Sequence, residues 1–327
     1  MRIVNENFFC AIVSFYIHNV CNYSCSYCSS HHYSGSNRWP TTWQPYVDFL
    51  KEVRKRNKYI FIEIFGGEPT LWPQFQDFID TISDENTFIE MSTNASRTLK
   101  YWEKFKSNRC FMILSWHHEF ANDDHFFEVA NILQHKGSVH VPLMVVPDNF
   151  ERAKKLYERF ERSNLNIDCQ PKFTRLSIGG SEYFPYTAEQ SEWINSVGFY
   201  RRKPWSIDWQ FPHHLLYDDK LVYWSDIAKH DIHKFKGWMC NAGVTRFFVE
   251  PDGNIQRCSK NVGGSLGNIF NEYKLPSEPI RCTVGSCPCK VDAIVEKWQD
   301  DIKVDENIKK FFDETYHKID EYKFLTK

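Results

Sequence analysis

The chain has 327 residues, of which 42% are hydrophobic and 25% are charged, and its formal net charge at pH 7 is −2. This composition is ordinary for a soluble globular protein, and the near-neutral charge argues against nucleic-acid binders, which usually carry a clear basic excess. No apolar run approaches the roughly 20 residues that span a bilayer, and the N-terminal stretch lacks the cleavage site of a signal peptide, so we expect no membrane partner and a cytoplasmic location.

The first half of the chain alternates short apolar runs with longer stretches of helical periodicity, a pattern that predicts βαβ units and a parallel sheet. The predicted strands are 10–17, 58–65, 87–92, 110–116, 138–146 and 165–173. The predicted helices are 42–56, 71–84, 97–107, 123–136 and 149–163. Six strands are too few for a closed eight-fold barrel. We therefore expect an α/β fold with a partial, open (β/α)6 TIM-like barrel over residues 1–175.

The second half is less regular. Residues 176–235 are rich in Trp, Tyr and His, with an isolated helix near 187–197, and we expect them to link the domains and to act as a lid. A hairpin signal and a second group of cysteines predict a small domain of a β-hairpin plus a helix at 236–292. A charged amphipathic helical tail is expected over 293–327.

The stretch CNYSCSYC at 21–28 follows the first predicted strand and contains three cysteines spaced C-x3-C-x2-C. With random placement, this spacing would occur somewhere in the chain with a probability of roughly one per cent. A disulfide framework does not suit a reducing cytosol, so metal binding is the leading interpretation. Three thiolates can hold an iron–sulfur cluster with one iron open. They can also form a Cys3His zinc site with one of the nearby histidines 18, 31 and 32.

A second motif, GGEP at 66–69, ends the second predicted strand. Two glycines there let the backbone approach a ligand closely, and Glu68 supplies an acceptor for an ammonium group. In parallel α/β folds the reactive groups gather at the carboxyl ends of the strands, which places both motifs at one rim. Together, CNYSCSYC and GGEPT resemble the radical S-adenosylmethionine (radical SAM) superfamily, over roughly residues 10–175.

This resemblance implies a [4Fe–4S] cluster whose open iron chelates the amino and carboxylate groups of S-adenosylmethionine (SAM). The implied cluster ligands are Cys21, Cys25 and Cys28. The residues implied at SAM are Tyr27 against the adenine, Gly66, Gly67, Glu68 and Pro69 at the methionine ammonium, and Thr93, Asn94 and Ser115 near the ribose and carboxylate. An electron donor such as flavodoxin or ferredoxin is implied as a partner. The implied reaction is reductive cleavage of SAM to a 5′-deoxyadenosyl radical, which removes a hydrogen atom from the substrate.

Residues 240–258, CNAGVTRFFVEPDGNIQRC, open the second group of cysteines. PDG is a strong turn signal between two strand-like runs, so Cys240 and Cys258 are expected close together at the ends of a hairpin. Three further thiols follow at Cys282, Cys287 and Cys289. This segment resembles the SPASM and twitch extensions of radical SAM enzymes, and its thiols suit one auxiliary [4Fe–4S] cluster of the twitch form. The pattern does not identify which four of the five bind it, and a zinc knuckle is the alternative.

The substrate is expected between the barrel rim and the lid segment. The residues expected around it are Trp116, His117, Gln170 and Lys172. A small molecule undergoing oxidation or rearrangement is favoured over a ribosomal peptide, because peptide-modifying relatives often carry a leader-recognition domain before the barrel, and the first strand here begins by residue 10. A nucleotide or nucleic-acid base is the third class, since aromatic residues in 183–223 could stack a base. A non-enzymatic iron–sulfur or zinc protein is the alternative from a different class.

Overall fold

The computed structural model describes residues 2–4, 10–106, 110–177, 182–197, 214–217, 220–223, 233–287 and 289–299, together with 310 and 314. The chain divides into two compact units. Unit 1 comprises Met1–Ser14, Gln44–Ile62 and Trp205–Lys327, and unit 2 comprises Phe15–Trp43 and Glu63–Pro204. The boundaries fall inside two strands, β2 (Cys10–Tyr16) and β3 (Tyr59–Phe65), which contribute residues to both units. No helix in the described part of the chain is long and apolar enough to cross a bilayer.

Unit 2 is built on a largely parallel sheet. After the ends of β2 and β3, its strands are β4 (Thr87–Thr93), β5 (Cys110–Leu114), β6 (Trp116–His117), β7 (Ser138–Val145) and β8 (Ile167–Phe173). The pairs β4–β5, β5–β7, β6–β7 and β7–β8 are all parallel. The six predicted strands are therefore confirmed, and they form an open sheet of the partial-barrel type rather than a closed barrel.

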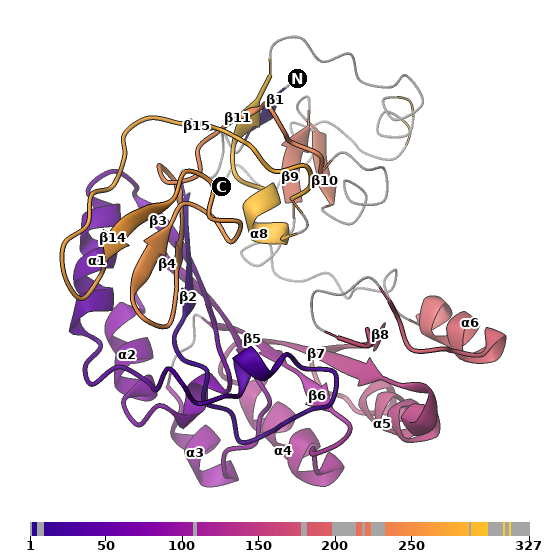
Figure 1. Ribbon diagram of the computed structural model, residues 1–327. Helices are drawn as coiled ribbons and strands as arrows, with labels where there is room; N and C mark the ends of the chain where they lie inside the picture. The colour runs from indigo at the N-terminus through magenta and orange to yellow at the C-terminus, as the bar shows by residue number, and fades with distance from the viewer. Residues whose placement is uncertain are drawn as a thin grey trace. The chain divides into compact units, whose positions relative to one another are not determined.

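Helices follow the strands of unit 2 in the predicted order. They are α2 (Phe75–Ile82), α3 (Leu99–Lys104), α4 (Asp123–Leu133), α5 (Phe150–Arg162) and α6 (Ala188–Val197), with short 3-10 turns at Ser30–His32, Pro69–Leu71 and Pro147–Asn149. In Figure 1, α2 to α5 lie along the outer side of the strands. Helix α5 shows the cause, because its buried residues recur every three or four positions as predicted: Phe150, Ala153, Leu156, Tyr157 and Phe160.

Two elements of unit 2 differ in extent from the prediction. The helix predicted at 71–84 begins only at Phe75, because Pro69–Leu71 form a 3-10 turn and Trp72 is extended. The strand predicted at 110–116 is divided at Ser115. The Ser115 amide donates to the carbonyl of Thr93 on β4 (2.9 Å). The next two residues form β6, which pairs with β7 instead. The change of partner ends β5 and sets Ser115 beside Thr93.

Unit 1 consists mainly of short antiparallel strands. The hairpin predicted around PDG is confirmed as β12 (Arg246–Val249) and β13 (Asn254–Gln256), and β13 pairs in turn with β14 (Ser265–Asn268). A second sheet has the order β10-β9-β1-β16-β11-β15. Its strands are β1 (Arg2–Val4), β9 (His214–Tyr217), β10 (Lys220–Tyr223), β11 (Met239–Cys240), β15 (Ile280–Arg281) and β16 (Lys297–Trp298). The helices of this unit include α1 (Gln44–Arg54) and α8 (Lys290–Ala293).

Strand β16 corrects the prediction of a helical tail that starts at about 293. Lys297 and Trp298 are extended and pair antiparallel with β11, so that Lys297 lies opposite Cys240. The pairing supplies hydrogen-bond partners that a charged, amphipathic sequence pattern does not reveal. Most of the remaining tail, and much of the predicted lid segment at 176–235, lie outside the described residues.

Candidate functional site

The loop with the first three cysteines follows β2 in unit 2. Cys25 is buried, Cys21 and Cys28 are half-buried, and the amide of Cys28 donates to the carbonyl of Cys25 (2.9 Å). Burial raises the pKa of Cys21 to about 11 and that of Cys25 to about 12, and the charge of Cys28 adds to the rise at both thiols. Without a nearby cation these thiols are neutral at pH 7, and a bound iron centre would convert them to the thiolate form. In the part of the chain that the structure describes, no group of three or more His, Cys, Asp and Glu side chains is preformed as a metal site.

The middle of this loop is held by the residues that follow β6. Both the amide and the hydroxyl of Ser26 donate to the Glu119 carboxylate, at 3.0 and 2.7 Å. The Tyr27 hydroxyl lies 2.8 Å from Nδ1 of His117, and the Tyr27 ring stacks on the rings of His117 and His118. Glu119 was not predicted, because nothing in the sequence distinguishes it from other exposed acidic residues. Cys25 is thus flanked by residues that a neighbouring strand end keeps in place.

Tyr27 and His117 are both uncharged at neutral pH. Burial lowers the pKa of His117 to about 4, so its imidazole is neutral and has one acceptor nitrogen. Burial also raises the pKa of Tyr27, so the phenol keeps its proton and can donate it to that nitrogen. The Tyr27 side chain, which is expected against the adenine of SAM, therefore has a defined orientation before any ligand binds.

The glycine pair at the end of β3 packs directly on the chain that leads into the cysteine loop. The amide of Gly67 donates to the carbonyl of His18 and that of Glu68 to the carbonyl of Val20, both at 2.8 Å. A Cβ at Gly66 would lie 2.5 Å from the His18 oxygen, and one at Gly67 only 2.2 Å from the Val20 oxygen. The prediction attributed these glycines to the close approach of a ligand. The structure shows that the approach of another backbone segment already requires them.

The Glu68 carboxylate joins the ends of β3 and β4. It is buried, and its Oε1 accepts from the amide and hydroxyl of Thr70 (3.1 and 2.5 Å) and from the Thr93 hydroxyl (2.7 Å). Its Oε2 accepts from the amide of Asn94 (2.6 Å) and, as a carboxylate oxygen, can accept a further hydrogen bond. Burial raises the pKa of Glu68 and the hydrogen bonds oppose that rise, so an approaching ammonium would further favour the charged form.

The predicted cluster ligands and the predicted SAM residues meet at this point. The Asn94 side chain donates to Asn22 (3.0 Å) and lies 3.9 Å from the sulfur of Cys21. Burial is the main cause of the raised pKa of Cys21, and the charge of Glu68 adds to it, so this carboxylate lies within electrostatic range of the thiol. The carboxyl ends of β2, β3 and β4 therefore bring one thiol, one carboxylate and one amide side chain together, as expected for the rim of a parallel sheet.

Gln170 and Lys172, predicted near the substrate, lie on β8 with Asp168. Alternation along the strand puts these three side chains on one face. The Gln170 amide donates to Asp168 (3.0 Å), and Asp168 in turn lies 2.8 Å from Nδ1 of His140. Gln170 is buried and Lys172 is exposed. His140 and Asp168 were not predicted as partners, since only the register of β7 and β8 places them opposite each other.

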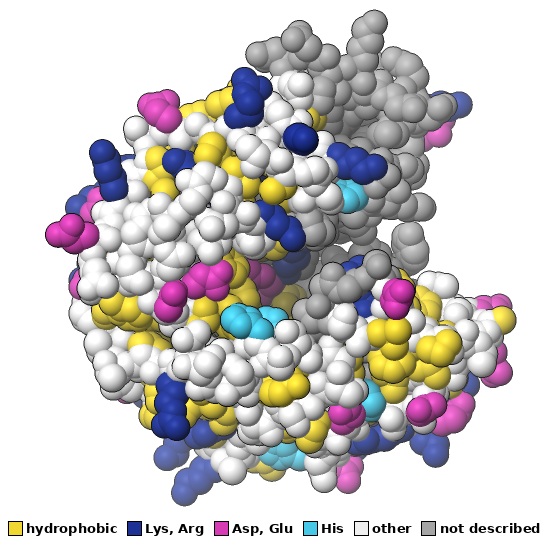
Figure 2. All heavy atoms as spheres, in the orientation of Figure 1, with side chains coloured by type: hydrophobic (Ala, Val, Ile, Leu, Met, Phe, Trp, Pro, Cys, Tyr) yellow, Lys and Arg dark blue, Asp and Glu magenta, His cyan; other side chains and the backbone are white. Residues whose placement is uncertain are grey.

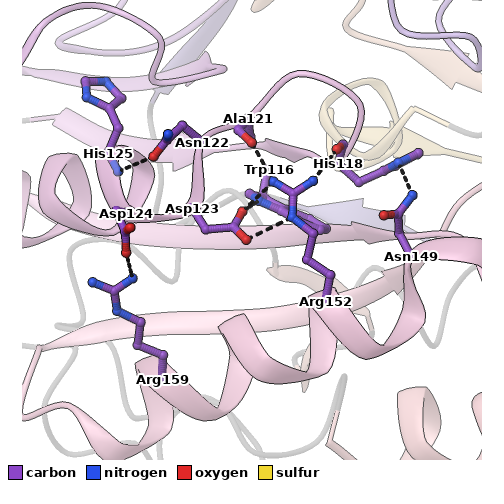
Figure 3. A network of polar contacts seen from close by, with 10 residues as sticks. All are labelled: Trp116, His118, Ala121, Asn122, Asp123, Asp124, His125, Asn149, Arg152 and Arg159. Atoms are coloured by element: carbon purple, nitrogen blue, oxygen red, sulfur yellow. Dashed lines mark hydrogen bonds and ion pairs between the residues drawn. The ribbon is translucent and has the colours of Figure 1, made fainter.

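Trp116, the fourth residue predicted near the substrate, is fully buried in the network drawn in Figure 3. Its indole nitrogen donates to Asp123 at the start of α4 (2.8 Å). Arg152 of α5 binds both oxygens of Asp123, and its guanidinium lies 5.2 Å from the centre of the Trp116 ring. Asn149, which directly precedes α5, forms a hydrogen bond with the ring of His118 (2.8 Å). Trp116 thus anchors the short strand that carries His117.

The later cysteines gather in unit 1. One cavity is lined by four of them: Cys240, Cys258, Cys282 and Cys287. All four are buried, and the predicted approach of Cys240 to Cys258 across the hairpin is confirmed. Cys289, which is half-buried at the start of α8, does not line the cavity. Burial raises the pKa of Cys258, Cys282 and Cys287, so a metal would again be needed to ionise them.

Comparisons with known proteins bear on the family and the fold. The Radical SAM superfamily model matches residues 15–170, and no curated protein matches the sequence. The fold is similar to that of native anSMEcpe with bound AdoMet and Kp18Cys peptide, at 15% identity and a TM-score of 0.50 over 81% of this chain and 78% of that one. It is also similar to Streptococcus suis SuiB bound to precursor peptide SuiA, at 13% identity and a TM-score of 0.51 over 81% of this chain and 63% of SuiB. Residues 15–170 form a radical SAM domain.

Proposed function

We propose that Cys21, Cys25 and Cys28 hold a [4Fe–4S] cluster and that the residues around Glu68 hold SAM beside it. The observation that carries this proposal is the meeting of Cys21, Glu68 and Asn94 at the carboxyl ends of three strands. When bound, the cluster and SAM would supply the chemistry that removes a hydrogen atom from an unactivated C–H bond. A protein donor of low potential, such as flavodoxin or ferredoxin, is the proposed source of the electron.

The chain's own residues orient SAM and exclude water. Glu68 offers Oε2 to the methionine ammonium, and the fixed ring of Tyr27 offers a flat surface to the adenine. The neutral Tyr27–His117 pair adds no charge that would draw water into the site. The other residues proposed at SAM are Gly66, Gly67, Pro69, Thr93, Asn94 and Ser115.

We propose a peptide as the substrate, in place of the small molecule that the sequence favoured. In support, two solved structures with the same fold contain peptides: anSMEcpe with the Kp18Cys peptide and SuiB with precursor peptide SuiA. The position of the first strand carries no weight against this class. The face in Figure 2 carries both basic and acidic side chains among hydrophobic ones, which gives no support to a nucleic-acid substrate. Gln170 and Lys172 are proposed to contact the peptide, and Trp116 to act through His117.

The substrate class can be tested by isotope transfer. The reconstituted protein is incubated with SAM, dithionite and extract from fully deuterated cells, and deuterium in 5′-deoxyadenosine is measured by mass spectrometry. We expect the label to require the fraction retained by dialysis and to disappear after protease treatment. Label from a dialysable, protease-resistant fraction would instead identify a small molecule as the hydrogen donor.

We further propose one auxiliary [4Fe–4S] cluster in unit 1, bound by Cys240, Cys258, Cys282 and Cys287. Their shared cavity supports this set and leaves Cys289 out. Four thiolates also suit zinc, and the metal content of the protein distinguishes the two centres.

Paired variants test this ligand set. Cys282→Ala with Cys287→Ala should lower the iron content of the reconstituted protein from about eight to about four atoms per chain, because two thiols cannot hold a cubane cluster. Cys289→Ala should leave about eight. Loss of iron from the Cys289 variant would show that the set is wrong, and zinc in place of the second four iron atoms would rule out the auxiliary cluster.

A further inference from the structure

A buried lysine, Lys297, lies beside the auxiliary cysteines. The Lys297 side chain is 1% exposed, and its Nζ donates to the carbonyls of Asp292 (2.5 Å), Ala293 (3.2 Å) and Val295 (2.9 Å). The ammonium also lies 4.9 Å from the centre of the Phe235 ring. Within the described residues, Lys297 forms no ion pair with Asp or Glu. These carbonyls and the ring satisfy its hydrogens but do not neutralise its charge.

The other two buried charges at this place neutralise each other. Arg246 and Asp292 are both buried, and Nε of Arg246 lies 2.7 Å from Oδ1 of Asp292. The second oxygen of Asp292 accepts from the amide (3.0 Å) and hydroxyl of Ser259. The positive charge of Lys297 is therefore left over. An isolated buried ammonium is strongly destabilising, which indicates that an anionic group belongs nearby.

The cysteine thiols that share the cavity with Lys297 can supply that negative charge. Lys297 lines the same cavity as the four cysteines and lies opposite Cys240 in the β11–β16 pair. Arg246 and Lys260 line the cavity as well, but Arg246 already has Asp292 and Lys260 is exposed. Lys297 is thus the buried charge that a centre made of thiolates would complement.

Building on the auxiliary centre proposed above, we propose that Lys297 is the built-in counter-charge of that centre and raises its reduction potential. A [4Fe–4S] core with four thiolates carries a net negative charge that grows by one on reduction. A fixed positive charge nearby therefore stabilises the reduced form more than the oxidised form. The same charge favours assembly of the centre, since it stabilises thiolates over thiols.

The test uses the protein in which Cys21, Cys25 and Cys28 are replaced by Ala, so that only the auxiliary cluster contributes. Its midpoint potential is measured by redox titration followed by electron paramagnetic resonance. We expect Lys297→Met, which keeps the chain length and the contact with Phe235, to shift the potential to a more negative value. Lys297→Arg should restore most of the original value. The matched control is Lys260→Met, which removes an exposed charge from the same cavity and should have a smaller effect.

Each outcome supports or overturns the proposed role of Lys297. An unchanged potential in an iron-loaded Lys297→Met protein overturns the role of Lys297 alone. If Lys297→Met fails to load iron, Lys297→Gln and Lys297→Arg decide: loading by Arg but not by Gln supports a requirement for charge, whereas loading by neither assigns Lys297 to shape and overturns it. Zinc in the unsubstituted cavity overturns both the redox role and the auxiliary cluster. The two failures are thereby distinguished.

Discussion

Replacing Cys21, Cys25 and Cys28 together by Ala is expected to abolish SAM cleavage and to lower the iron content from about eight to about four atoms per chain. The three thiols lie in one loop and influence one another electrostatically, whereas the other four line a separate cavity in unit 1. Removing one set should therefore leave the other loaded. The measurements are iron and sulfide content after anaerobic reconstitution, and 5′-deoxyadenosine formed with dithionite.

The matched control replaces three cysteines that lie in strands: Cys10, Cys110 and Cys169. Burial raises the pKa of Cys10 to about 12 and that of Cys169 well above its usual value, in keeping with thiols that act as small apolar side chains. This variant should retain its iron and its SAM cleavage, with some loss of stability. Iron near eight in the loop variant, or a loss of iron in the control, would contradict the assignment of the first cluster.

The parts of the fold that could be predicted are those that depend on the local periodicity of apolar residues. Alternating apolar runs and the three-to-four-residue spacing of the buried positions in α5 depend only on neighbours in the chain. Strand β16 could not be predicted, because Lys297 and Trp298 become extended through pairing with β11, far away in sequence. The division of one predicted strand at Ser115 has the same origin, since its amide pairs with β4 and the following residues pair with β7.

The candidate site shows the same limit. The cysteine spacing and GGEP could be read directly, and the motif order placed them at one rim. The reason for the glycines could not be read, because it depends on the carbonyls of His18 and Val20 lying within reach of a Cβ. The proposal that Cys289 is not a ligand likewise needed the cavity, since C-x4-C-x-C spacing treats its three thiols alike. Spacing indicates the chemistry, and long-range packing indicates which residues to propose for it.

Replacing Glu68 by Ala is expected to weaken SAM binding by roughly ten- to hundred-fold while the first cluster stays in place. A charge-assisted hydrogen bond of this kind is worth about 1.5–3 kcal/mol. The cluster should remain, because the cysteine loop is also held by the Ser26–Glu119 and Tyr27–His117 contacts. Burial is the main cause of the raised pKa of Cys21, and the charge of Glu68 adds to it. Removing the Glu68 carboxylate therefore favours the thiolate form of Cys21. Equilibrium binding of SAM to the reconstituted protein measures the affinity, and the iron content shows whether the first cluster is retained.

Glu68→Ala alone cannot separate contact with SAM from support of the rim, because the carboxylate also accepts from Thr70, Thr93 and Asn94. Thr70→Val makes the separation. It removes a donor to Oε1 and leaves Oε2, the oxygen with room for an ammonium, in place. If Glu68 binds SAM directly, the Val variant loses stability but keeps its affinity for SAM within a few-fold. Equal losses of affinity in both variants would mean that Glu68 only joins β3 to β4, and that the methionine ammonium finds its acceptors on the backbone.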